Sequence, residues 1–287
     1  MVTLTFDAIV IGTGQTGPSL AARLASEGKQ VAIIDTPLPR GANSNDSSTP
    51  LRALGAIARA AHQTQNAKNF GVGSEGDTHV DMQEVHERLD EISDKVQKSA
   101  RDRLHNLDRV TVIRRQARFE ANDTIRCGEQ LLQAEQIFIN VGGQPIVPAT
   151  FADIGSMTSS DIMNVTLRPE HLIVAGGSDR GLAYAQIFRR FGSEVTLLER
   201  EARILPQEDE SLSQYVHELL IAEGVRIRTN AECLTGRRSD DRIAVQLACS
   251  DHPEDLEGSH LLLAFGRQPN TADLGLQNTD VAVNKHG

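Results

Sequence analysis

The sequence predicts an α/β protein built from two similar three-layer domains. Two stretches, one near the start and one past the middle, share the same order of parts: an apolar strand, a glycine-rich turn, a helix, a second apolar strand and an acidic residue. In both stretches the same number of positions separates the first glycine of the turn from the acid. Repeated β–α–β units of this kind predict parallel sheets covered by further layers.

In the first stretch, the residues from Ala8 to Ile11 form an apolar run rich in β-branched side chains, which predicts a buried strand. The turn that follows reads Gly12-Thr13-Gly14-Gln15-Thr16-Gly17, and a second strand runs into Asp35. Gly12 permits the tight turn, Gly14 lets the backbone approach a pyrophosphate, and Gly17 lets helix and strand pack closely. The helix N-terminus favours phosphates, and Asp35 suits ribose hydroxyls. The alternative is a β–α–β unit whose turn binds nothing.

The composition excludes several classes of protein. No apolar run is long enough for a membrane helix, and no secretory leader opens the sequence, so we expect a cytoplasmic protein without a membrane partner. A net charge of -10 with scattered basic residues argues against nucleic acid as a partner. The cysteines, Cys127, Cys233 and Cys249, lie far apart without metal-ligand spacing, so we expect reduced buried thiols and no metal site.

Between the two stretches the apolar period changes several times. A loop of small polar residues and prolines covers 36–50, and helices are expected over 51–68 and from Met82 to Leu104. Strands are expected near 110–113, 117–119, 124–126, 130–132 and 136–143, followed by a linker over 145–169.

The second stretch repeats the first with one change in the turn. Leu172 to Ala175 predicts a strand, the turn reads Gly176-Gly177-Ser178-Asp179-Arg180-Gly181, and the next strand closes on Glu199. Ser178 replaces the second glycine, so its Cβ crowds a pyrophosphate. Glu199 favours a free ribose 2′-hydroxyl and hence NAD(H), although Arg200 and Arg203 leave NADP(H) open. The alternative for Glu199 is an exposed charged turn.

The remaining segments complete the second domain and return to the first. A helix over 212–223 and strands near 225–228, 231–235 and 242–249 are expected, and the apolar strand 260–266 repeats 136–142 in ending on glycine. The expected domains are therefore 1–150 plus 262–287 for the first and 151–261 for the second.

Several segments of the sequence resemble those of the pyridine nucleotide–disulfide oxidoreductases, most closely those of the mercuric reductase and dihydrolipoamide dehydrogenase branch. The resemblance covers essentially the whole chain. The segments are Ile11-Gly12-Thr13-Gly14-Gln15-Thr16-Gly17-Pro18, Phe138-Ile139-Asn140-Val141-Gly142, His171-Leu172-Ile173-Val174-Ala175-Gly176-Gly177-Ser178 and Gly266-Arg267-Gln268-Pro269-Asn270-Thr271.

The resemblance implies two tandem Rossmann-like domains, FAD on the first and a nicotinamide cofactor on the second, with hydride transfer from NAD(P)H to the flavin. It implies that FAD is bound by Gly12, Gly14, Gln15, Thr16, Gly17 and Asp35, with Ala117 beside the adenine, Val141 and Gly142 near the dinucleotide and Arg52 near the flavin. It implies that the nicotinamide cofactor is bound by Gly176, Ser178, Gly181, Glu199, Gly266 and Arg267.

The sequence also departs from the family. The two cysteines of its redox disulfide correspond to Asn43 and Ser48, which cannot form thiolates, and its lysine corresponds to Arg52. The family's glutamate and tyrosine correspond to Ala183 and Asp179, and the sequence ends before the family's dimerisation domain. A structural salt bridge is an equal alternative for Arg52, and no residue is assigned a catalytic role.

Two functions follow from these observations. The first is a flavin-dependent NAD(P)H oxidoreductase that passes electrons directly to a small-molecule acceptor and reduces neither disulfides nor mercuric ion. The second is a catalytically degenerate relative that binds nucleotides as a binding or interaction module. A homodimer and a separate C-terminal partner chain both remain open.

Overall fold

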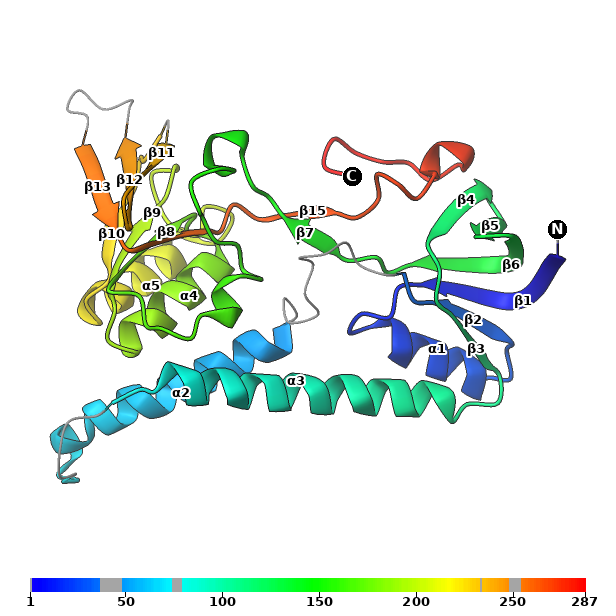
Figure 1. Cartoon of the computed structure of the whole chain (residues 1–287), viewed down its shortest axis with the longest axis horizontal. Coiled ribbons are helices and arrows are strands. Elements are labelled where there is room, and N and C mark those ends of the chain that lie inside the picture. The colour runs from blue at the N-terminus through cyan, green and yellow to red at the C-terminus, as the bar shows by residue number, and fades with distance from the viewer. Residues whose placement is uncertain (1, 37–47, 74–78, 233, 248–253) are drawn as a thin grey trace. The chain divides into compact units, whose positions relative to one another are not determined.

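The computed structural model describes residues 2–36, 48–73, 79–232, 234–247 and 254–287. The chain divides into two compact units (Figure 1). The first unit comprises Met1–Ser47, Ser93–Gln144 and Arg267–Gly287, and the second comprises Ser48–Ile92 and Pro145–Gly266. Each unit contains parallel strands covered on both faces, which confirms the predicted α/β class.

The first unit is built on a six-stranded sheet with the order β3-β2-β1-β6-β5-β4. The neighbouring strands β3, β2, β1 and β6 run parallel to one another. Beyond β6, the sheet continues with β5 and β4, which pair antiparallel. Its elements are β1 (Val2–Ile11), α1 (Gly17–Ser26), β2 (Val31–Ile34), β3 (Val110–Ile113), β4 (Ala117–Ala121), β5 (Thr124–Cys127), β6 (Gln130–Ile139) and η5 (Leu276–Asn278).

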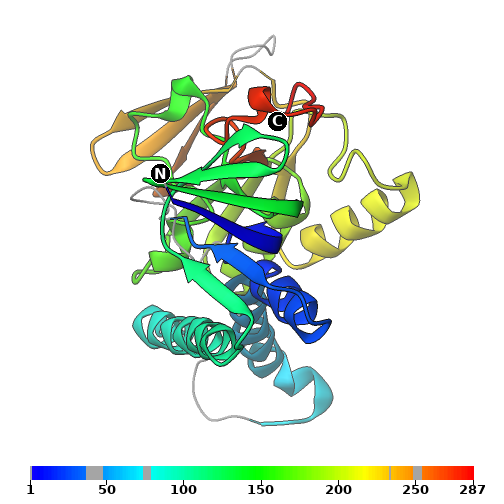
Figure 2. The same ribbon diagram turned by 90° about the vertical axis from the view of Figure 1, so that its right-hand side faces the viewer.

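Alternate residues of β1 enter two different cores, as the period of a strand requires. Ala8 and Val10 pack with α1 and with Leu104, near the end of α3 (Met82–His105), so these helices cover one face of the sheet (Figure 1, Figure 2). Ile9 and Ile11 face the other way, into a core shared with β4, β5 and the C-terminal segment. The parallel strands of the sheet are therefore the middle layer of three.

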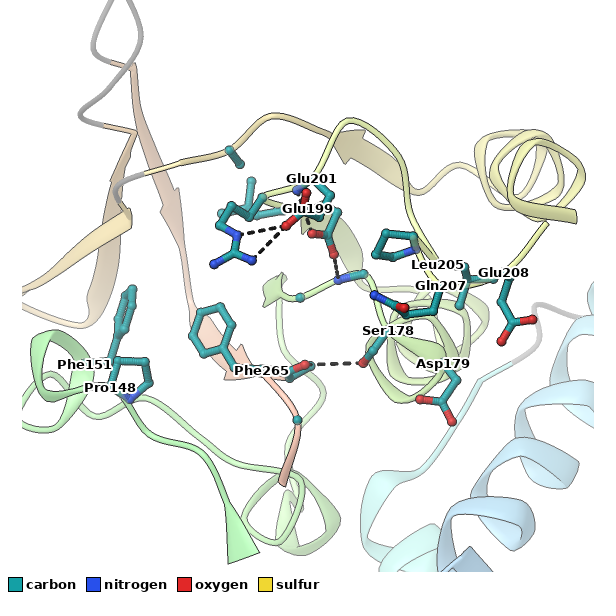
Figure 3. Close-up of a pocket in the computed structure, with 18 of the residues that line it drawn as sticks. Pro148, Phe151, Ser178, Asp179, Glu199, Glu201, Leu205, Gln207, Glu208 and Phe265 are labelled. Carbon is teal, nitrogen blue, oxygen red and sulfur yellow. Dashed lines mark hydrogen bonds and ion pairs between the residues drawn. The ribbon is translucent and has the colours of Figure 1, made fainter. Parts of the chain in front are cut away.

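The second unit has a four-stranded parallel sheet with the order β10-β9-β8-β14. The carboxyl ends of β8 and β9 border the pocket of Figure 3. The elements of this unit are α2 (Ser48–Gln65), η2 (Ala67–Phe70), the first part of α3, η3 (Ala149–Phe151), η4 (Ile162–Asn164), β8 (His171–Ala175), α4 (Asp179–Arg190), β9 (Glu194–Leu198), α5 (Glu210–Ala222), β10 (Arg226–Arg228), β11 (Leu234–Ser239), β12 (Arg242–Leu247), β13 (Glu254–Gly258) and β14 (His260–Leu263).

This sheet is also a middle layer. Its Leu172 and Val174 pack with side chains of α2, α3, α4 and α5, whereas Ile173 and Ala175 pack with the antiparallel sheet β11-β12-β13. The chain passes between the two units at 47–48, 92–93, 144–145 and 266–267. The strands β7 (Gly143–Pro145) and β15 (Arg267–Pro269), at the last two of these points, pair with each other. None of the helices in the described part of the chain is long and apolar enough to cross a membrane.

The units differ from the expected domain boundaries in three places, one of which is that the middle segment of the first unit ends at Gln144 rather than at residue 150. Residues 48–92 belong to the second unit, because Leu54 and Ala58 of α2 and Leu89 of α3 are buried in its core. The expected return to the first domain at residue 262 falls inside β14, where Leu262 pairs with Val174 of β8. The return occurs at Arg267 instead.

Most expected elements are present, with some corrections. The separate strands expected near 130–132 and 136–143 are one strand, β6, which ends at Ile139 and pairs with β1 along most of its length. β1 itself begins at Val2 rather than Ala8, because its first residues pair through the backbone although their side chains are mostly exposed. The strands β13 and β15 were not expected from the sequence.

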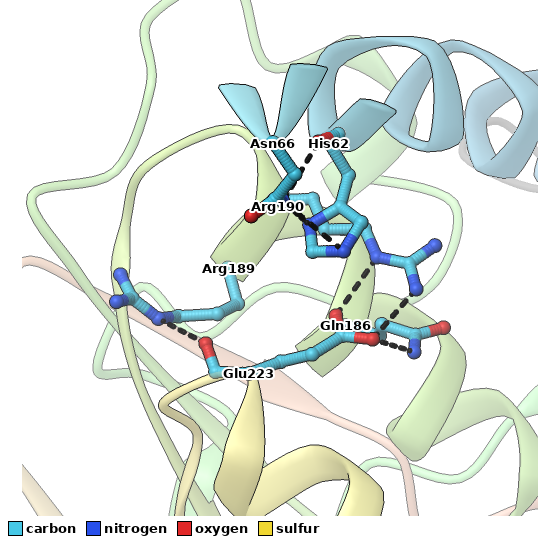
Figure 4. Close-up of polar contacts among 6 residues, drawn as sticks. All are labelled: His62, Asn66, Gln186, Arg189, Arg190 and Glu223. Atoms are coloured by element: carbon cyan, nitrogen blue, oxygen red, sulfur yellow. Dashed lines mark hydrogen bonds and ion pairs between the residues drawn. The ribbon is translucent and has the colours of Figure 1, made fainter. Parts of the chain in front are cut away.

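Polar side chains tie three helices of the second unit together near their C-termini (Figure 4). The Arg190 guanidinium donates two hydrogen bonds, of 2.8 and 2.7 Å, to the carboxylate of Glu223, and Gln186 donates a third of 2.9 Å. Gln65 of α2 donates to the Arg190 carbonyl at 3.1 Å. Burial alone would raise the pKa of Glu223, but the hydrogen bond and charge of Arg190, with the bond from Gln186, hold that pKa below its ordinary 4.5.

We expect Glu223→Gln to lower the free energy of unfolding by about 2 kcal/mol near neutral pH, because Arg190 is left largely buried without its counter-charge. Urea unfolding monitored by circular dichroism measures the change. The pKa of Glu223 is lowered in the folded chain, so its stabilisation is complete above the ordinary pKa and is lost as pH falls through the lowered one. The difference between variant and wild type should therefore shrink below pH 4.5.

The matched control is Glu194→Gln, whose ion pair with Arg226 has side chains 67% and 58% exposed. An exposed pair contributes little to stability, so this variant should show no measurable change. Equal effects of the two substitutions would contradict the role assigned to Glu223.

Candidate functional site

The first glycine turn joins β1 to α1 by direct contact between backbone segments. Gly12 has a φ of +112°, and a Cβ there would overlap the carbonyl oxygen of Asn140, just after β6. A Cβ on Gly17 would overlap the carbonyl oxygen of Gly12. A Cβ on Gly14 would meet only the Asn140 side-chain nitrogen, at 4.0 Å. The backbone at Gly14 is therefore open to a ligand, which is what a bound pyrophosphate requires.

Asp35 follows β2 at the edge where this turn lies. The Thr13 hydroxyl donates a hydrogen bond to its Oδ1, and the Arg114 Nε lies 3.7 Å from its Oδ2. The Asp35 side chain is 40% exposed, so the carboxylate is oriented yet accessible. Sequence reasoning missed the roles of Thr13 and Arg114. Arg114 could have been found, because it is the first residue after the strand parallel to β2.

The second turn has the same backbone packing. Gly176 has a φ of +118°, and a Cβ there would lie 2.5 Å from the carbonyl oxygen of Ala264, which follows β14 as Asn140 follows β6. A Cβ on Gly181 would overlap the carbonyl oxygen of Gly176. Ser178 precedes α4, and its hydroxyl donates to the Ala264 carbonyl at 3.4 Å.

Glu199 follows β9, and backbone donors hold its carboxylate. The Gly177 N–H donates to Oε2 at 2.6 Å, and the Glu201 N–H donates to Oε1 at 2.8 Å (Figure 3). The residue is only 8% exposed. A carboxylate accepts about four hydrogen bonds, so both oxygens keep capacity for ribose hydroxyls. The alternative interpretation of Glu199, an exposed charged turn, does not agree with this burial.

A pocket with a volume of about 950 Å³ opens beside this turn in the second unit. Phe151 and Phe265 form an aromatic wall, with ring centroids 5.9 Å apart. The pocket is lined by charged residues of mostly one sign, namely Asp179, Glu199, Arg200, Glu201 and Glu208. Arg200 donates to Glu201 at 2.8 Å, and that hydrogen bond and charge raise the pKa of Arg200.

Several other predicted residues lie next to the turns. In the first unit, Gln15 and Thr16 complete the first turn, with Thr16 at the N-cap of α1, and Val141 and Gly142 follow β6. The carbonyls of Val141 and Gly142 accept hydrogen bonds of 3.0 Å from Asn270. In the second unit, Gly266 lines the pocket.

Three further predicted residues are not among those that form the two turns or line the pocket. Ala117 is buried at the start of β4. The Arg267 guanidinium donates to the Gly143 carbonyl within the first unit. Arg52 is exposed on α2 in the second unit, whereas the first glycine turn belongs to the first unit. The binding roles of these three residues stay predictions.

The cysteine that the structure describes is not a candidate redox group. Cys127 is free and buried in the first unit, and burial raises the pKa of its thiol to about 11. Asn43, Cys233 and Cys249 lie outside the described residues. Within the described ranges no group of three or more potential ligand side chains could hold a metal ion.

Comparisons with known proteins match this architecture. The family model described as pyridine nucleotide-disulphide oxidoreductase matches residues 6–287. The probable pyridine nucleotide-disulfide oxidoreductase RclA of Escherichia coli (strain K12) is 30% identical over 291 residues, which cover 98% of this chain and 61% of RclA. A dihydrolipoyl dehydrogenase of Thermus scotoductus is 29% identical over 288 residues, covering 99% of this chain and 62% of the relative.

A solved structure of the HOCl-induced flavoprotein disulfide reductase RclA from Escherichia coli superposes with a TM-score of 0.81 at 29% identity, covering 98% of this chain and 61% of that one. The chain thus spans about 61% of the length of RclA. The match over nearly all of its residues agrees with the two glycine turns and their carboxylates. The chain belongs to the pyridine nucleotide-disulphide oxidoreductase family.

Proposed function

We propose that the first unit binds FAD, that the second unit binds NADH, and that the chain is a flavin-dependent oxidoreductase. The observation that carries this proposal is the paired geometry of the two turns, in which a glycine turn before a helix stands beside an oriented carboxylate. In the first unit these groups are Gly14 and Asp35. In the second they are the Ser178 turn and Glu199. When bound, NADH supplies a hydride that the flavin accepts.

The residues present fit the adenosine ends of both cofactors. Asp35 is oriented by Thr13 and Arg114, and the Gly14 backbone is open, as the phosphates of FAD require. Glu199 keeps acceptor capacity for ribose hydroxyls, and its charge repels a 2′-phosphate. Arg200, the nearest guanidinium in the sequence, is paired with Glu201. These contacts support NADH over NADPH.

We further propose that this chain uses no disulfide relay. RclA is described as a disulfide reductase, but the positions that correspond to the family's cysteine pair hold Asn43 and Ser48 here. Neither residue has a sulfur atom that could accept electrons. The two electrons of the hydride would then pass directly from the flavin to a small-molecule acceptor such as a quinone, a dye or oxygen.

A nucleotide-binding protein without turnover is the second candidate. It is favoured by the joint replacement of the cysteine pair and of the lysine, glutamate and tyrosine positions, now Arg52, Ala183 and Asp179. The two candidates agree on binding and differ on flavin reduction, so a single spectroscopic experiment separates them.

We expect the purified chain, supplied with FAD, to show flavin absorption bands that bleach when NADH is added without oxygen. NADPH should bleach them more slowly because of the charge on Glu199. Anaerobic visible spectroscopy measures both rates. Bound FAD that NADH cannot reduce would favour the second candidate, and a chain that takes up no FAD would contradict both.

We expect Asp35→Ala to weaken FAD binding roughly 10- to 100-fold, since hydrogen bonds to a charged acceptor are lost. Isothermal titration calorimetry with FAD measures the change. The control is Asp123→Ala, which removes a carboxylate from the hairpin between β4 and β5 of the same unit. A similar loss in both variants would contradict the role of Asp35.

We expect Glu199→Gln to reduce the preference for NADH over NADPH roughly fivefold, because it removes one charge that opposes the 2′-phosphate. The ratio of the two dissociation constants, measured by fluorescence titration, reports the effect. An unchanged ratio would show that Glu199 does not select the cofactor.

A further inference from the structure

Asp179 holds an unusual position at the second glycine turn. It is the first residue of α4, it is exposed, and it lines the pocket together with Ser178 (Figure 3). Within the described part of the chain its carboxylate forms no hydrogen bond or ion pair. The N-terminal end of α4, which borders the pocket, therefore carries a negative charge that these residues do not pair.

The first glycine turn provides an internal comparison. Both turns join a parallel strand to a helix, both begin with a glycine of positive φ, and in both a Cβ on the last glycine would overlap the carbonyl of the first. The residue three positions after the first glycine is Gln15 in one turn and Asp179 in the other. The two turns thus share their close glycine contacts and differ in charge at this position, although α4 begins at Asp179 whereas α1 begins two residues after Gln15.

The other charged residues that line the pocket do not compensate the charge of Asp179. Three further carboxylates line the same pocket, those of Glu199, Glu201 and Glu208, and the guanidinium in the lining, that of Arg200, is paired with Glu201. The N-terminus of a helix normally attracts phosphate through its partial positive charge. A full negative charge on the first residue of α4 opposes that attraction.

We propose that Asp179 is a charge-selecting residue of the second pocket, which weakens the binding of the dinucleotide pyrophosphate and makes the site favour the least negatively charged pyridine nucleotides. This inference rests on the proposed binding of NADH to the second unit. It implies that the affinity for NADH rises when the charge of Asp179 is removed or screened, and that the gain is larger for NADPH, which carries more negative charge.

A purely structural role for Asp179 leads to the opposite expectation. An acidic residue in the first turn stabilises a helix through the dipole, so its loss would lower the thermal stability and leave ligand binding unchanged or weaker. The variant Asp179→Gln separates these roles, because it removes the charge and puts at this position glutamine, the residue that the first turn has at Gln15.

The experiment titrates the intact chain with NADH and NADPH and follows nucleotide fluorescence. At low salt, Asp179→Gln should tighten NADH binding about threefold to tenfold, and NADPH binding by a larger factor. At about 0.5 M NaCl the gain should fall below about twofold, because salt screens exposed charges. Asp179→Glu keeps the charge and should behave as the wild type does.

Two further variants test the position of the charge. Glu208→Gln removes a carboxylate that lines the same pocket but does not belong to α4, and it should give at most half the effect. Gln15→Asp places a charge on the first turn and should weaken FAD binding by a similar factor. Equal effects of Glu208→Gln and Asp179→Gln, or FAD binding unchanged by Gln15→Asp, would overturn the proposal.

The outcomes also separate this inference from the proposed function. NADH binding that Asp179→Gln leaves unchanged or weakens would overturn the charge-selecting role while the proposed function stands. Binding tightened by Asp179→Gln without bleaching of the flavin would support the role and overturn the proposed oxidoreductase. A chain that binds neither nucleotide in any variant, at either salt concentration, would overturn both.

Discussion

Both units depend on one close approach of backbone, between a glycine turn and the residue that follows a neighbouring parallel strand. Gly12 lies against Asn140, and Gly176 lies against Ala264, with no room for a Cβ in either place. The contact fixes where the helix starts relative to the strand ends. The helix N-terminus, the glycine turn and the carboxylate after the second strand are then brought to the same edge of the sheet, which is where open α/β sheets bind ligands.

The turns could be predicted because their requirements are local. Spacing alone identified Gly12, Gly17, Asp35 and their counterparts, since the chain between glycine and acid is a single β–α–β unit. The membership of residues 48–92 could not be predicted in this way. It depends on packing between α2 and α4, which buries Leu54 in a core made by residues far away in the sequence. The order of elements along the chain does not show this packing.

The hydrogen-bond partners of the two carboxylates could not be predicted from the sequence either. Thr13 and Arg114 orient Asp35 through their side chains, whereas backbone N–H groups of Gly177 and Glu201 hold Glu199. A backbone donor is the same in every residue, so no sequence pattern reveals it. The consequence is physical as well: Glu199 is buried and fixed by the fold itself, whereas the orientation of Asp35 can be changed by a single side chain.

The proposed electron path is based on the residues that this chain has at the positions of the family's redox disulfide. A redox disulfide accepts a pair of electrons and carries them away from the flavin, so that the final acceptor need not approach it. With Asn43 and Ser48 at the corresponding positions, and with the Cys127 thiol buried at a pKa of about 11, this chain offers no such intermediate among the residues that the structure describes. In the proposed reaction the acceptor must therefore reach the flavin itself, which favours small molecules over protein disulfides.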